Sequence, residues 1–254
     1  MFPISDYPNP RGLPWMTLVL IAVNVAVFVL VTVPLSIEPA NPADPRVAAY
    51  LSAVAQSLPP GTSLSAVAGG LTDYDLFVFD WAFRPAAMSL ATLFVSMFLH
   101  GGFMHLFGNM LFLWIYGNNV EHRLGPFWYV VAYLVCGIAA AAFQTAFNLG
   151  SQIPMLGASG AISGVLGFYL RWFPHHKVKI FVFLFPFYVG SIFLPASLVL
   201  WMYLIVDNLF PFVFSGSAGG GVAHGAHIGG FIAGLAMAWA LGKPRAEPAE
   251  GELH

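Results

Sequence analysis

The sequence LGASGAISGVLG at residues 156–167 begins an apolar segment with a serine placed between glycines. The segment, 159–173, is shorter than the roughly 20 residues that a membrane-spanning helix requires. We therefore expect its helix to begin within the membrane, at Ser159. A hydroxyl at that depth must be hydrogen-bonded internally or take part in chemistry, because lipid offers it no partner.

The composition of the whole chain identifies a multi-spanning membrane protein. Of the 254 residues, 59% are hydrophobic and 8% are charged, and the mean hydropathy is +0.79, which is far more apolar than a soluble domain. The nine Lys and Arg residues are scattered singly and the net charge is −2, which excludes a nucleic-acid partner. Cys136 is the single cysteine, so an internal disulfide is excluded and a helix-packing role is predicted.

The apolar runs predict an all-α polytopic membrane protein with six transmembrane helices. The first run is too long for the ~7–15-residue apolar region of a cleaved signal peptide, so it is interpreted as a span. The run 180–190 is ambiguous because prolines and a glycine interrupt it, and it is either interfacial or an early start of the fifth helix. The predicted spans are 15–33, 103–120, 127–148, 159–173, 191–210 and 223–241.

The segments outside these spans are short at both ends of the chain and long after the first span. Residues 1–13 are polar and Pro-rich and predict a short, disordered cytoplasmic lead, and residues 243–254 predict a polar cytoplasmic tail. A single transmembrane domain, 14–242, lies between them. The aromatic second half of the long first loop, 81–99, is typical of a segment that lies in the membrane interface.

The basic residues indicate how the chain is oriented. With six spans both termini lie on one side, and seven of the nine Lys and Arg residues fall on that side. Because basic residues are enriched in cytoplasmic loops, the termini are predicted to be cytoplasmic. The seven are Arg11, Arg123, Arg171, Lys177, Lys179, Lys243 and Arg245, whereas Arg46 and Arg84 fall on the other side.

Polar residues from three predicted spans share one depth in the membrane: Ser159, His105, Asn109 and His227. Each lies 12 or 16 residues from the first inner charge of its span, which is about 18 to 24 Å above the inner boundary of a core about 30 Å thick. Such residues are costly unless they face one another or water, so they are functional candidates.

Ser159 differs from an ordinary membrane serine. Such a hydroxyl usually bonds to the carbonyl one turn earlier, as is predicted for Ser163, but Ser159 begins its helix and has no preceding turn. Its backbone N–H is a first-turn donor at the positive end of the helix dipole, which suits an oxyanion. His105 and Asn109 are four residues apart, so both face the same pocket.

Glycine pairs predict that the fourth and sixth helices pack closely. Gly160 with Gly164, and Gly230 with Gly234, form GxxxG patterns, which permit close backbone contact between membrane helices. The second pair lies one and two turns from His227, so close packing is predicted to bring the imidazole to the serine hydroxyl.

A serine beside a histidine suits nucleophilic acyl transfer. The hydroxyl is inert at its free pKa and needs a base, and an imidazole can take the proton and return it to the leaving amine. No membrane carboxylate shares the layer to orient the imidazole. A dyad of Ser159 and His227 is therefore predicted, without a cofactor or a metal.

These motifs resemble those of the rhomboid intramembrane serine proteases. The matching pieces are HGGFMHLFGNM at 100–110, GASG at 157–160 and AHIGG at 226–230 with Gly234, and the resemblance covers about residues 81–241. It implies a bacterial-type, six-transmembrane rhomboid-like bundle in a bacterial inner membrane, with its site open to the outer side. The implied partners are the lipid bilayer and transmembrane proteins, which would be cleaved near their outer ends through an acyl-enzyme.

The resemblance also implies a role for each matching residue. Ser159 is the expected nucleophile and His227 the expected general base, and the oxyanion hole is expected from His105, Asn109 and the backbone N–H of Ser159. Gly157 leaves room for the turn before the serine. Structural roles are implied for His100, Gly157, Gly160, Glu121, Arg123, Gly230 and Gly234.

Two polar residues are not part of this pattern. His224 lies three residues before His227 and so on a neighbouring helix face, where an accessory role is predicted, such as binding water or capping the helix. Asp207, near the outer end of the fifth span, is predicted to cap the helix or face water.

Two other classes of protein match parts of the sequence. A non-catalytic rhomboid-like protein would bind client helices, but relatives of that kind lack the serine or the histidine, and this chain has both. A metal site would use His100, His105, His224 and His227. No HExxH motif is present, and the first two histidines are five residues apart rather than the four that place two ligands on one helix face.

Overall fold

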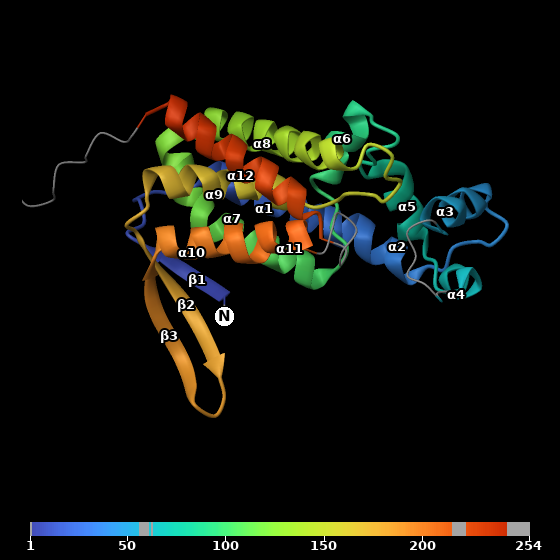
Figure 1. Cartoon of the computed structure of the whole chain (residues 1–254), viewed down its shortest axis with the longest axis horizontal. Coiled ribbons are helices and arrows are strands. Elements are labelled where there is room, and N and C mark those ends of the chain that lie inside the picture. The colour runs from blue at the N-terminus through green and yellow to red at the C-terminus, as the bar shows by residue number, and fades with distance from the viewer. Residues whose placement is uncertain (1, 56–60, 62, 215–221, 243–254) are drawn as a thin grey trace, which may run out of the picture.

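The computed structural model describes residues 2–55, 61, 63–214 and 222–242, and most of them form helices that run side by side (Figure 1). The strands are β1 (Phe2–Tyr7), β2 (Lys177–Leu184) and β3 (Tyr188–Pro195). The helices are α1 (Trp15–Val27), α2 (Val33–Ile37), α3 (Pro45–Ala55), α4 (Leu64–Gly69), α5 (Asp73–Trp81), α6 (Leu90–Ser96), α7 (Phe103–Leu124), α8 (Pro126–Phe147), α9 (Ser159–Trp172), α10 (Ala196–Leu204), α11 (Phe210–Phe214) and α12 (His224–Ala240), with π-helical turns η1 (Phe28–Thr32) and η2 (Ile205–Leu209).

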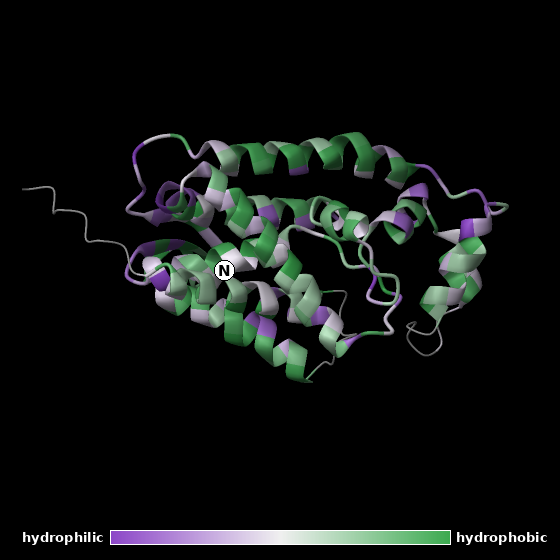
Figure 2. Ribbon diagram, turned by 90° about the horizontal axis from the view of Figure 1, so that it is seen from above, coloured by the Kyte–Doolittle hydropathy of each residue, from purple (hydrophilic) through white to green (hydrophobic). Residues whose placement is uncertain are grey.

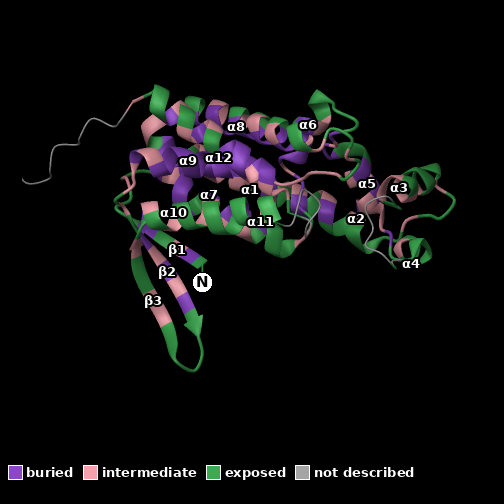
Figure 3. Ribbon diagram, in the orientation of Figure 1, coloured by how far each residue is buried: buried purple, intermediate pink, exposed green. Residues whose placement is uncertain are grey.

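Helix α9 forms the centre of the bundle. Twelve of its fourteen residues are buried, and α7, α8, α10 and α12 all contact it. Figure 3 shows burial along almost the whole of α9 and the adjoining part of α12. Leu166 and Tyr169 are fully enclosed. The helix that begins at Ser159 is therefore held in place by its neighbours on several sides.

Glycines make the contact between α9 and α12. A Cβ added at Gly230 would overlap the carbonyl oxygen of Gly160, and a Cβ added at Gly234 would overlap that of Gly164. The two helices therefore touch through their backbones. This confirms the close approach that the two GxxxG patterns predict.

Three described helices are long and apolar enough to cross a membrane: Trp15–Ile37, Pro126–Phe147 and Ala196–Phe214. Apolar residues dominate the helices in Figure 2, and hydrophilic ones gather in the connecting segments. Helix α9 has 14 residues and α12 has 17, which is shorter than the roughly 20 of a full span. The count of six spans stays a prediction.

The prediction of a disordered N-terminal lead is wrong for residues 2–7. They form β1, which pairs antiparallel with β2. Asp6 is buried and accepts hydrogen bonds from Asn119 Nδ2, at 2.8 Å, and from the Tyr169 hydroxyl. The polar side chains that suggested disorder therefore fasten the strand to α7 and α9.

The all-α prediction is wrong in this region as well. Residues 177–195 form the β2–β3 hairpin, which joins β1 in a three-stranded antiparallel sheet. Aromatic and β-branched residues favour strands here, and the prolines that interrupt the run cannot lie inside a helix. The fifth helix consequently begins at Ala196 rather than near residue 191 and continues to Phe214.

The long first loop contains α3, α4, α5 and α6, which lie at one end of the bundle (Figure 1). A capping box begins α5, in which Thr72 and Asp75 satisfy each other's backbone N–H groups. The hydroxyl of Tyr74 donates to the carbonyl of His100 at 2.8 Å. This bond docks the loop against the start of α7, next to His105.

Candidate active site

The structure brings the two predicted central residues together. Ser159 is the first residue of α9 and His227 lies in the first turn of α12. The Oγ of Ser159 and the Nε2 of His227 are 2.7 Å apart. The glycine contacts between the two helices hold this hydrogen bond, and an imidazole at this distance can accept the hydroxyl proton.

A third residue, absent from the predicted site, contacts the histidine from the other side. The Oδ1 of Asn208 lies 2.7 Å from the Nδ1 of His227. Asn208 belongs to η2 and is 1% exposed. The sequence offered one signal that could have found it, which is a polar amide in the largely apolar run 196–214. The adjacent polar residue, Asp207, is exposed.

His105 and Asn109 flank the loop that leads into α9. A Cβ added at Gly157 would lie 2.7 Å from His105 Nε2 and 3.7 Å from Asn109 Nδ2. That amide nitrogen is buried and makes no hydrogen bond within the described part of the chain. It is therefore a donor without a partner, beside the start of α9, and a developing oxyanion would supply the missing acceptor.

The backbone N–H groups in the first turn of α9 are further hydrogen-bond donors at the site. Ala158, the N-cap residue, provides no side-chain hydrogen bond, so no capping side chain competes for the first-turn N–H groups. The loop before it is fixed by a bond from Gly157 N to Ser96 O, at 2.8 Å. Gly157 has a φ of +117°, a backbone conformation that favours glycine.

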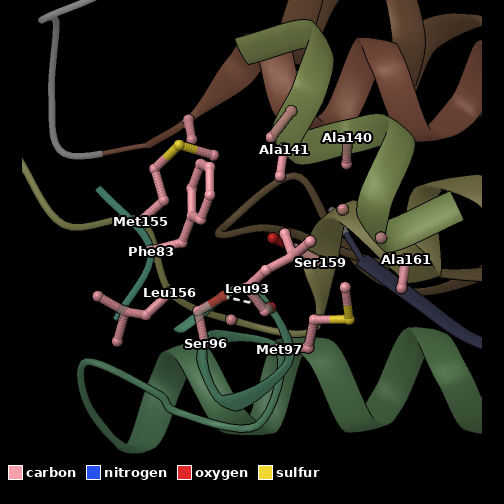
Figure 4. Close-up of a pocket in the computed structure, with 15 residues that line it drawn as sticks. Phe83, Leu93, Ser96, Met97, Ala140, Ala141, Met155, Leu156, Ser159 and Ala161 are labelled. Carbon is pink, nitrogen blue, oxygen red and sulfur yellow. Dashed lines mark hydrogen bonds between the residues drawn. The ribbon is translucent and has the colours of Figure 1, made fainter. Parts of the chain in front are cut away.

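A small cavity of about 50 Å³ adjoins Ser159. Figure 4 shows Ser159 among its lining, with Phe83 and Leu93 from the first-loop region, Met155 from the loop before α9 and Ala140 from α8. The lining is mostly apolar, and the cavity has room for a small side chain. The first loop thus forms one wall of the site.

Three further residues that the sequence analysis singled out, Ser163, His100 and His224, lie around the serine and histidine. Ser163 donates to the carbonyl of Ser159 at 2.8 Å, which confirms its predicted back-bonding, and lies 2.6 Å from the Tyr203 hydroxyl. His100 is buried, with its ring edge-on to that of His105 at 5.1 Å. His224 Nδ1 is 3.4 Å from Asn208 Oδ1, which places it beside the site.

Glu121 and Arg123 make structural contacts with different partners. Glu121 accepts from the backbone N–H groups of Met16 and Thr17, at 2.9 and 2.7 Å, so its carboxylate caps the N-terminus of α1. Arg123 stacks on the ring of Trp172, 4.4 Å from its centroid. Both residues therefore connect α7 to neighbouring helices, at the end of the bundle opposite the first loop.

The four histidines of the alternative metal site, His100, His105, His224 and His227, are all among the described residues. Within residues 2–55, 61, 63–214 and 222–242, no group of three or more His, Cys, Asp or Glu side chains is arranged to hold a metal ion. The rings of His224 and His227 are 6.3 Å apart and edge-on, and Nε2 of His227 is engaged with Ser159.

Comparison with known proteins identifies the family. Residues 87–244 match the rhomboid domain, and this match covers most of the chain, including Ser159, His227, His105 and Asn109. The chain therefore belongs to the rhomboid family. With its apolar helices, this makes it an integral membrane protein.

Individual relatives match over a similar region. The chain is 32% identical over 152 residues to rhomboid protein 1, mitochondrial, of Saccharomyces cerevisiae, which covers 58% of this chain and 41% of that protein. It is 34% identical over 149 residues to rhomboid protease GluP of Bacillus subtilis, covering 58% and 25%. It is 29% identical over 161 residues to rhomboid protease GlpG of Salmonella choleraesuis, covering 63% and 51%. The matched region is thus between a quarter and about half of each relative.

Proposed function

We propose that this protein is an intramembrane serine endopeptidase that cleaves transmembrane segments of other membrane proteins near their outer ends. The observation that carries the proposal is the 2.7 Å contact between Ser159 Oγ and His227 Nε2 at the start of a buried helix. Two of the relatives are named rhomboid proteases, which supports the same reaction class.

In the proposed reaction, His227 takes the proton of Ser159 while Oγ attacks the carbonyl carbon of the scissile peptide bond. Negative charge develops on the carbonyl oxygen. The backbone N–H of Ser159, the unpartnered amide of Asn109 and the ring of His105 are the donors on that side. The imidazolium then protonates the leaving amine, and the acyl-enzyme remains on Ser159.

Water completes the proposed cycle. It attacks the acyl carbon while His227 accepts a proton from it. His227 then gives this proton to Ser159 Oγ as the acyl–oxygen bond breaks, which releases the carboxylic acid product and restores the serine hydroxyl. The small cavity beside Ser159 favours substrates with a small side chain at the cleaved bond. Both termini are proposed to be cytoplasmic, because basic residues are enriched on that side. The resemblance to bacterial rhomboids leads us to propose a bacterial inner membrane, with the site open to the outer side.

The test is a cleavage assay in proteoliposomes on a panel of single-pass substrates, together with labelling by a serine-directed fluorophosphonate. We expect Ser159→Ala to abolish cleavage and labelling, and His227→Ala to lower both by at least about a hundredfold. The matched control is Ser163→Ala, one turn further along α9, which should keep its labelling. Full cleavage by Ser159→Ala would overturn the proposal, and wild-type protein that binds substrates without cleaving them or reacting with the fluorophosphonate would favour a client-binding role.

A further inference from the structure

We propose that Asn208 is the positioning residue of His227, so that the site is a relay of serine, histidine and asparagine rather than a dyad. The side-chain carbonyl of Asn208 accepts a hydrogen bond from Nδ1–H of His227. This bond holds the imidazole in the tautomer whose Nε2 is free to accept the proton of Ser159. The inference rests on the proposed function.

The distances describe a continuous chain of hydrogen bonds. Asn208 Oδ1 is 2.7 Å from His227 Nδ1, and His227 Nε2 is 2.7 Å from Ser159 Oγ. A neutral imidazole carries one proton, so only one ring nitrogen can donate. If Asn208 accepts at Nδ1, then Nε2 has no proton and can act as the base.

The orientation of the amide is determined by its other contact. Asn208 Nδ2 is 2.8 Å from the backbone carbonyl of Tyr203. A carbonyl oxygen only accepts, so the NH₂ group must point to it, and Oδ1 must then face His227. A flipped amide would set two acceptors against each other and direct a donor at the histidine. Asn208 is 1% exposed, so water does not compete for either contact.

The contact between Asn208 and the carbonyl of Tyr203 lies at a π-helical turn. In η2 the backbone hydrogen bonds run to the fifth residue back instead of the fourth. The wider turn lets the side chain of Asn208 reach the carbonyl five residues earlier. Such turns occur frequently at functional sites, and this one aims an amide at a histidine on a different helix.

An amide suits this position better than a carboxylate. A buried charge inside a membrane is costly, whereas the amide provides the same acceptor oxygen without a charge. The neighbouring Asp207 is exposed and interacts electrostatically with His224. The other titratable groups near His227 are His224 on its own helix, Tyr203 on α10, His105 on α7 and Ser159 on α9.

The first experiment compares Asn208→Ala with wild type in cleavage and in fluorophosphonate labelling. Removal of the acceptor lets the imidazole adopt the wrong tautomer, so we expect kcat and the labelling rate to fall by about 10- to 100-fold. We expect KM to change by less than about threefold, because Asn208 is 1% exposed and so presents almost no surface to a substrate.

The matched control is Asn24→Ala. Asn24 is also a fully buried asparagine in a long apolar helix, and its Nδ2 also bonds to a backbone carbonyl, at 2.7 Å to Leu20. Both variants should lose similar thermal stability in detergent, but only Asn208→Ala should lose kcat. Equal kcat in the two variants would overturn the positioning role.

The pH profile gives a readout that a structural role would not move. Asn208→Asp retains an acceptor, and its carboxylate favours the imidazolium form of His227. We expect labelling to persist and its half-maximal pH to rise by about one unit or more. An unchanged profile would contradict the inference.

A spectroscopic measurement avoids dependence on any Asn208 variant. In protein labelled with ¹⁵N-histidine, the signal that disappears in His227→Ala should show a protonated Nδ1 and an unprotonated Nε2 in the neutral form. The opposite tautomer would overturn the inference while Ser159 is still labelled. If wild-type Ser159 is not labelled at all, the proposed function itself fails, so the two failures can be distinguished.

Discussion

Helices α9 and α12 contrast with the fifth helix, α10–η2–α11. The α9–α12 contact is made backbone to backbone by glycines, and α9 is almost completely buried. In the fifth helix, only Ala196, Leu200 and Asn208 are buried, and most of its large apolar side chains are exposed. Figure 3 shows the same difference.

The contrast separates two tasks within one site. The serine and histidine, whose side chains are 2.7 Å apart, are both on the closely packed pair of helices. The residue proposed to set the histidine tautomer is on the weakly packed helix. Under the proposal for Asn208, the position of the fifth helix decides which tautomer of His227 is favoured.

The largest effect is expected from Gly234→Ala. The added Cβ would overlap the carbonyl oxygen of Gly164, a backbone atom that cannot move aside. Separation of α9 from α12 should destabilise the protein by about 3 kcal/mol or more and abolish fluorophosphonate labelling. The measurements are thermal unfolding in detergent and the labelling rate.

Gly108→Ala is the control for this prediction, because nothing lies within 4 Å of the added Cβ on α7. It should be neutral, or stabilising by up to about 1 kcal/mol. If Gly234→Ala and Gly108→Ala had the same unfolding temperature and labelling rate, the α9–α12 contact would not be rigid.

The second effect is expected from Gly157→Ala. The new Cβ would lie 2.7 Å from Nε2 of His105, so the oxyanion side of the site should shift and kcat should fall by about a hundredfold. Gly125→Ala is the matched control, because Gly125 also has a positive φ but no atom within 4 Å of the added carbon. A comparable loss of kcat in both variants would attribute the effect to backbone strain alone.

A third test uses the same substitution in both regions. Leu166 on α9 is 0% exposed and Leu198 on α10 is 46% exposed. Leu166→Ala should leave a cavity and lower the unfolding free energy by about 2 to 4 kcal/mol. Leu198→Ala should change it by less than about 0.5 kcal/mol. Unfolding by denaturing detergent in mixed micelles measures both, and similar losses would show that the fifth helix is as tightly packed as α9.

The smallest effect concerns Asp6, which anchors β1 to the far end of α9. Burial raises the pKa of Asp6 from 3.8 to about 6, so the folded state binds more protons than the unfolded state between these values. Stability should therefore fall as the pH rises from about 4 to about 6. Asp6→Asn should flatten this slope in pH-dependent thermal unfolding. A slope that persists in the variant would assign it to another group.

The sequence was sufficient to predict the elements that are long or carry paired signals. The predicted span 103–120 lies within α7, and 159–173 differs from α9 by one residue. The GxxxG patterns predicted the α9–α12 contact because two glycines one turn apart leave a helix face without side chains, which lets another helix approach its backbone. These are local patterns, and local patterns are visible without a structure.

The rest depended on contacts between distant residues. The strand at residues 2–7 exists because β2 supplies its hydrogen bonds, some 175 residues later, and no pattern within the segment indicates that partner. Asn208 was missed for the same reason. An amide in an apolar run has no evident role until the turn of η2 directs it toward α12, and the usual orienting group for a catalytic histidine is a carboxylate.

The closeness of α8 to α9 also has a practical consequence. Cys136 is 0% exposed, and a Cβ at Gly164 would overlap its sulfur. It is the single thiol of the chain. A maleimide can therefore react only when these two helices separate, so the rate of alkylation in a bilayer reports how often the bundle opens. The unmodified protein thus carries its own probe of local unfolding, and no engineered label is needed to follow it during turnover.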